Sequence, residues 1–118
     1  MVRKLTKDDY DGFLRERRFA VVHFDAAWDS GYRPTARRAM VEAEEEVGPD
    51  GIVSFGEVDV DAEMQLAKQA RVENVPTFAY YRDGVRIATI NGAGTIVERL
   101  RRLMRGERID ASSVPAAP

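Results

Sequence analysis

The sequence predicts an α/β domain in which a central mixed β-sheet is covered by helices on both faces. Short apolar runs typical of buried strands alternate with segments of helical periodicity, in the order β-α-β-α-β-α-β-β-α. The early β-α-β unit requires parallel strands, whereas Asp83-Gly84 between the last two strands is a strong hairpin signal. A sheet that contains both kinds of connection is mixed.

The first half of the chain predicts two helices around one strand. Thr6 followed by Asp9 resembles a capping box, and apolar residues at helical spacing extend this helix over residues 7–17. Residues 19–24 are almost continuously apolar, which is typical of a central strand buried on both faces. The second helix has Pro34 in its first turn and ends before Gly48-Pro49.

Charges on the second helix run against its dipole. Its first turns carry Arg33, Arg37 and Arg38, and its last turns carry four glutamates. Positive charge near a helix N-terminus is unfavourable by a few tenths of a kcal/mol, roughly, for each exposed charge. The pattern raises the question of a role for these charges, and the alternative is a solvated helix face on which Arg38 pairs with Glu42 at i,i+4.

The second half predicts three strands and two helices. A strand over residues 52–60 is followed by Asp61, which we expect to cap a short helix over residues 62–70. The hairpin strands cover residues 78–81 and 85–90, and an amphipathic helix follows Thr95. We assign residues 1–105 to the folded domain and residues 106–118 to a disordered tail.

Composition limits the functions that the chain can have. The 118 residues carry a net charge of −2, with acidic and basic residues interspersed, so we expect no nucleic acid or membrane partner. The N-terminus has no apolar signal segment, which favours the cytoplasm. With one histidine and no cysteine, we expect no metal site and no cofactor.

Four motifs make the chain similar to thioredoxin-fold proteins. They are Phe24-Asp25-Ala26-Ala27-Trp28, Val58-Asp59-Val60-Asp61, Val75-Pro76-Thr77-Phe78 and Asp83-Gly84. The resemblance covers about residues 2–105 and implies a thioredoxin fold. It further implies that Pro76 is a cis-proline facing the active-site turn, and that Gly92 lets a bound peptide approach the backbone.

The chain departs from this family at the active-site turn. The resemblance places Asp29 and Tyr32 at the two cysteine positions, with Ser30 and Gly31 between them, and His23 at the position of the buried acid. Thiol–disulfide exchange requires a thiolate. These vestigial positions predict that the protein is not an enzyme, and that a redox annotation would reflect ancestry.

The leading hypothesis is a redox-inactive module that binds a polypeptide, as an adaptor, chaperone-like factor or assembly factor. It would use the ancestral substrate groove, with two arginines on the rim. The expected contact residues are Trp28, Asp29, Tyr32, Val75, Pro76, Gly92, Arg33 and Arg37. The alternatives are a non-thiol enzyme and a dimerisation domain that forms a homodimer through the same site.

Three residues have a structural interpretation beside the functional one. His23 is either a buried neutral imidazole with one hydrogen bond or a partner of Tyr32; in the enzyme alternative it acts with Tyr32 or Asp29. Asp29 is best explained as a helix N-cap. Trp28 either packs on the sheet edge, where it helps to hold Asp59 or Asp61, or provides an exposed platform for a partner.

Overall fold

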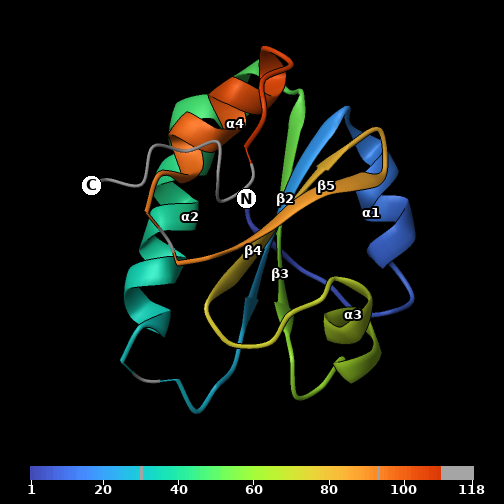
Figure 1. Ribbon diagram of the computed structural model, residues 1–118, viewed down its shortest axis with the longest axis vertical. Helices are drawn as coiled ribbons and strands as arrows, with labels where there is room; N and C mark the ends of the chain where they lie inside the picture. The colour runs from blue at the N-terminus through green and yellow to red at the C-terminus, as the bar shows by residue number, and fades with distance from the viewer. Residues whose placement is uncertain (30, 93, 110–118) are drawn as a thin grey trace.

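A computed structural model describes residues 1–29, 31–92 and 94–109, and it has an α/β fold with one central sheet (Figure 1). Five strands form one mixed sheet in the order β1-β3-β2-β4-β5. The strands are β1 (Arg3–Lys4), β2 (Phe19–Asp25), β3 (Val53–Asp59), β4 (Thr77–Arg82) and β5 (Val85–Asn91). The helices are α1 (Tyr10–Glu16), α2 (Arg33–Val47), α3 (Met64–Gln69) and α4 (Ile96–Met104), with a 3-10 turn at Gly48–Asp50.

The sheet separates two apolar layers. Helices α2 and α4 lie on one face, and α1 and α3 lie on the other (Figure 1). Side chains along a strand alternate between faces, so Val21 packs in the α2/α4 layer and Val22 in the α1/α3 layer. Strand β2 is buried along its whole length because it is central and covered on both faces.

Two helices begin later than predicted: α1 begins at Tyr10 rather than at residue 7, and α3 begins at Met64 rather than at residue 62. The backbone N–H of Thr6 donates to Asp9 Oδ1 at 2.7 Å, which is the return bond of a capping box. Before α3, the expected cap at Asp61 is not formed: the helix begins at Met64 without a side-chain cap from the described residues, and Asp59 Oδ1 accepts the backbone N–H groups of Asp61 and Ala62 at 2.9 and 3.4 Å in the preceding turn. No helix among the described residues is long and apolar enough to cross a membrane.

The packed chain continues beyond the predicted boundary at residue 105. The side chain of Ile109 is 1% exposed and belongs to the α2/α4 core layer. The remainder of the predicted tail, residues 110–118, lies outside the described residues. The structural unit therefore includes at least four residues that the sequence analysis assigned to a disordered tail.

Candidate functional site

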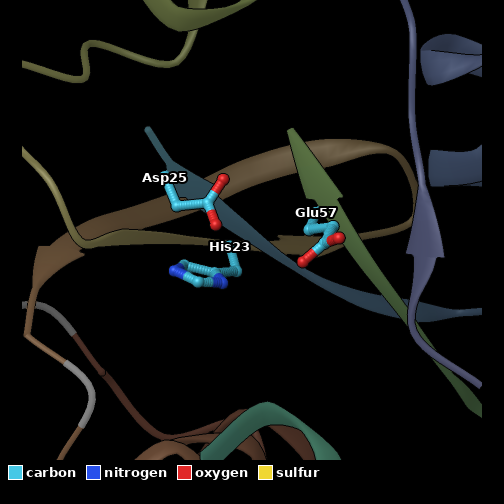
Figure 2. A group of neighbouring side chains, drawn as sticks. All are labelled: His23, Asp25 and Glu57. Atoms are coloured by element: carbon cyan, nitrogen blue, oxygen red, sulfur yellow. The ribbon is translucent and has the colours of Figure 1, made fainter. Parts of the chain in front are cut away.

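Strand pairing brings a group of polar side chains together beneath α2. His23 and Asp25 are two residues apart on β2, so both point to the α2/α4 face. His23 is paired with Glu57 on β3 and with Phe78 on β4, which places these side chains on the same face. Figure 2 shows that His23 and Asp25 extend from β2 and Glu57 from the neighbouring strand β3, and that the three side chains lie close together.

His23 is completely enclosed. Its side chain is 0% exposed, and neither ring nitrogen has a hydrogen-bond partner among the described residues. Burial lowers the pKa of His23 to about 4, because it disfavours the charged imidazolium, although neighbouring Asp25 acts in the opposite direction. The imidazole is thus buried and neutral as expected, but the expected hydrogen bond is absent.

Two hypotheses about His23 are therefore wrong. The pairing of His23 with Tyr32 does not occur, since the imidazole has no hydrogen-bond partner in the described part of the chain and the Tyr32 side chain is 69% exposed. A fully enclosed imidazole also cannot reach a substrate, which removes the non-thiol enzyme that used His23 with Tyr32 or Asp29.

Asp25 is the acceptor that explains the arginines at the start of α2. Arg33 Nε donates to Asp25 Oδ2 at 2.7 Å, and Arg37 Nε lies 3.6 Å from the same oxygen. Arg37 also contacts Glu57 Oε1 at 3.2 Å. The two arginines thus neutralise acids inside the fold, which corrects the expectation that they line the rim of the groove. The dipole-opposing charge pattern was a signal for this cluster, but Asp25 itself was missed.

Asp29 has a capping role at the turn before α2. Its Oδ1 accepts the backbone N–H of Tyr32 at 3.1 Å, the bond expected of an N-cap residue, although regular helix begins only at Arg33. Asp29 is buried, and its Oδ2 has no partner among the described residues. Of the two residues between Asp29 and Tyr32, Gly31 is exposed and Ser30 lies outside the described residues.

Trp28 and Tyr32 are large exposed aromatic side chains on the same turn. Trp28 is 68% exposed and Tyr32 is 69% exposed. This exposure does not fit the interpretation that Trp28 packs on the sheet edge, and no hydrogen bond joins it to Asp59 or Asp61 in the described part of the chain. Exposed aromatic residues of this size are uncommon away from interaction sites, because they leave a large apolar area in water.

A groove of about 350 Å³ lies beside Tyr32, and its surface is mostly apolar. It is lined by Tyr32, Thr35, Ala36, Asn74, Val75, Pro76, Asn91, Gly92 and Gly94. Four of the predicted contact residues therefore meet there, namely Tyr32, Val75, Pro76 and Gly92. The predicted contacts Trp28, Asp29, Arg33 and Arg37 are not part of its lining.

Backbone geometry shapes this groove. The Val75–Pro76 peptide bond is cis, and the N–H of Gly92 donates to the carbonyl of Pro76 at 3.0 Å. Gly92 has a φ of +87°, a conformation that suits glycine. Asn91 donates to Asn74 and to Thr77 Oγ1, which ties the loop before Pro76 to the end of β5. Sequence reasoning missed Asn74 and Asn91 because their pairing depends on the β4–β5 register.

A family model, curated relatives and solved structures all match this chain to thioredoxins. The thioredoxin family model matches residues 1–105. A thioredoxin from Coprinus comatus is 29% identical over 94 residues, 79% of this chain and 87% of the relative. One from Geodia cydonium is 32% identical over 81 residues, 67% of this chain and 73% of the relative. The crystal structure of thioredoxin from Trypanosoma brucei brucei has a TM-score of 0.76 and 26% identity, covering 89% of this chain and 92% of that one.

These relatives correct one prediction. They carry the name of an oxidoreductase family. The prediction that the protein is not an enzyme is therefore wrong at the level of family membership. The composition is unaffected, because the 118 residues include no cysteine. A thiol that reacts at this site would therefore have to come from a molecule other than this chain.

Proposed function

The chain belongs to the thioredoxin family, and from this premise we propose that it binds a polypeptide in extended conformation through the groove beside Pro76. The observation that carries the proposal is the combination of an apolar groove with an exposed aromatic residue, Tyr32, on its wall. In this role the protein acts as an adaptor, chaperone-like factor or assembly factor. The cytoplasm is the location proposed with it.

The backbone beside the groove supports strand addition. Val75 lies outside the regular strands, and its N–H and C=O form no hydrogen bond with other described residues. Free backbone groups next to a groove are the elements that bind an extended peptide, whose main chain supplies the complementary donor and acceptor. Gly92 leaves the opposite side open, because nothing lies within 4 Å of the position a Cβ would take there.

The lining indicates which peptides fit best. None of the described residues that line the groove is charged, and its polar side-chain groups are the amides of Asn74 and Asn91 and the hydroxyls of Thr35 and Tyr32. An apolar side chain of the peptide would bury its surface against Pro76, Ala36 and the ring of Tyr32. We therefore propose a partner segment that is extended and has an uncharged apolar residue at its centre.

Peptide selection followed by measured affinities tests this proposal. Peptides selected from a random display library on the wild-type protein are synthesised, and their binding is measured by fluorescence anisotropy. The double variant Trp28→Ala/Tyr32→Ala is expected to bind at least about tenfold more weakly, because central aromatic contacts contribute most of the affinity in such interfaces. The matched control is Met64→Ala/Val85→Ala, which removes two side chains that are 62% and 61% exposed.

Two results would contradict the proposal. The first is equal affinity of the selected peptides for the wild type and the Trp28/Tyr32 variant. The second is a set of NMR amide shifts that leaves Asn91 and Gly92 unchanged on peptide addition. The homodimer alternative gives a different result: sedimentation would show association of the protein alone that increases with concentration and is abolished by Tyr32→Ala.

A further inference from the structure

We propose that His23, Asp25 and Glu57 form a binding site for one divalent transition-metal ion, which we name the β2–β3 site. The proposal is independent of the peptide groove, since none of the three residues lines it. One imidazole and two carboxylates are a donor set that suits ions such as Zn²⁺, Mn²⁺ and Co²⁺. A single histidine and no cysteine led us to expect no metal site, but carboxylates on neighbouring strands also supply ligands.

The fold places the three donors together without help from a loop. His23 and Asp25 alternate onto one face of β2, and Glu57 is the cross-strand neighbour of His23 on β3. One ligand atom from each residue lies within 4.8 Å of the others (Figure 2). Donor atoms bound at about 2.1 Å in a tetrahedral site are roughly 3.4 Å apart, so side-chain shifts of about 1 Å would close the site.

His23 supplies an observation independent of the acids. Its side chain is fully buried, yet both ring nitrogens lack a hydrogen-bond partner in the part of the chain that the structure describes. A buried polar group without a partner is unfavourable, and it needs an explanation. An unprotonated imidazole next to two carboxylates is the form that binds a metal ion. An ion in the β2–β3 site would give one of these nitrogens its partner.

The two arginines of α2 compete with the ion for the carboxylates. Arg33 is the firmer partner, with Nε 2.7 Å from Asp25 Oδ2, whereas the Nε of Arg37 is 3.6 Å from that oxygen. The side chain of Arg37 is also 45% exposed, so it can turn into water at little cost. We infer that Arg37 leaves when the ion binds, and that Arg33 remains on Asp25 as a partner that orients the ligand.

Titration of the full chain with Zn²⁺ tests the site. The protein is first treated with EDTA and dialysed, and calorimetry then measures stoichiometry and affinity. Co²⁺ is used in parallel, because its visible absorption reports the coordination geometry. We expect one ion per chain, and a loss of affinity of at least about 100-fold in both His23→Leu and Glu57→Gln. Circular dichroism confirms that each variant is folded.

The variant Arg37→Met tests whether this arginine and the ion compete for the carboxylates. Removing a half-exposed competing cation should strengthen Zn²⁺ binding by about fivefold. The matched controls are Arg38→Met and Glu45→Gln, which change exposed charges on the same helix and should leave the affinity unchanged. A purely structural role for the cluster would not make the Arg37 variant bind the ion more tightly.

Three outcomes would overturn the proposal. The first is that the wild-type protein binds no Zn²⁺, even if the Arg37→Met variant does. It could bind Zn²⁺ with an affinity that His23→Leu does not change, which would assign the ion to surface carboxylates. Co²⁺ could also give the spectrum of the hydrated ion, which would exclude an imidazole ligand.

Discussion

The imidazole of His23 lies flat against the ring of Phe78, with ring centroids 4.8 Å apart and planes inclined by 12°. The two residues are cross-strand neighbours on β2 and β4, so the sheet register itself produces the stack. Stacking fixes the orientation of the imidazole but satisfies neither of its nitrogens. The protein therefore has a rigidly held polar group at the centre of its sheet.

His23 should make the metal-free protein less stable in acid. The pKa of His23 is about 4 in the folded state and about 6.5 when unfolded, so below pH 6.5 the unfolded chain binds a proton that the folded chain does not. The free energy of unfolding should fall by about 3 kcal/mol between pH 7 and pH 4 from this residue alone. Urea unfolding in EDTA measures it, and His23→Leu should lose about 1 kcal/mol per pH unit of slope between pH 6 and pH 5. Equal slopes in both proteins would contradict the prediction.

Three buried tyrosines should limit stability at alkaline pH. Burial raises the pKa of Tyr10, Tyr80 and Tyr81 above the ordinary value of 10. Above pH 10 the unfolded chain therefore releases protons that the folded chain retains, and the free energy of unfolding falls as pH rises.

Tyr80→Phe isolates one of these tyrosines. The hydroxyl of Tyr80 is buried and has the guanidinium of Arg99 as its charged neighbour, so the variant removes one buried ionisable group. Denaturant unfolding at pH 9, 10 and 11 should show a shallower alkaline decline than in the wild type, by at most about 1 kcal/mol per pH unit. A decline of unchanged steepness would show that Tyr80 ionises equally in both states.

Arg33→Met should destabilise the fold through Asp25. The Asp25 carboxylate is 1% exposed, and loss of Arg33 leaves it with only the longer contact to Arg37. Removing a charged hydrogen-bond partner from a buried group costs about 2 kcal/mol. Thermal or urea unfolding measures the loss, and Arg38→Met is the control on the exposed side of α2. If the effect comes from the pair, Asp25→Asn combined with Arg33→Met should cost less than the sum of the two single changes.

Gly56→Ala and Gly12→Ala should have opposite effects. A methyl group at Gly56 would lie 2.6 Å from Leu5 Cδ1 and 2.9 Å from Phe13 Cζ, and the resulting overpacking should cost about 1 to 3 kcal/mol. At Gly12, an exposed position in α1, nothing lies within 4 Å, and alanine should stabilise by about 0.5 to 1 kcal/mol. Urea unfolding of both variants checks the signs. A neutral Gly56→Ala would show that α1 can move away from the sheet.

Much of the fold could be predicted from local patterns. The family resemblance carried by motifs such as Val75-Pro76-Thr77-Phe78 is confirmed by the family match, and the sheet class is confirmed by the structure. The predictions were wrong where the path of the folded chain, and not the local pattern, decides which residue makes a contact. Asp61 was expected to cap α3, but the helix begins only at Met64, and the acid that bonds the preceding turn is Asp59. Ile109 was assigned to the tail because its surroundings in sequence are polar, yet it packs in the core.

The candidate site was predicted in part. Tyr32, Val75, Pro76 and Gly92 do line one groove, because the resemblance already placed these positions together. The arginines were expected at its rim, but Arg33 and Arg37 turn toward the sheet. Their partners lie eight to twenty positions away in sequence, and helical or strand spacing gives no information about contacts at that distance.

The sequence by itself determined the fold class and the absence of a reactive thiol. The fold class follows from periodicity among neighbouring residues, and the missing thiol follows from the composition. Only the tertiary structure decided how the charges and the histidine are used. Parallel pairing of β2 with β3 places Glu57 beside His23, and packing of α2 on the sheet brings Arg33 to Asp25. These contacts depend on which strands become neighbours and how a helix is oriented above them, and both are set by burial of the whole apolar core.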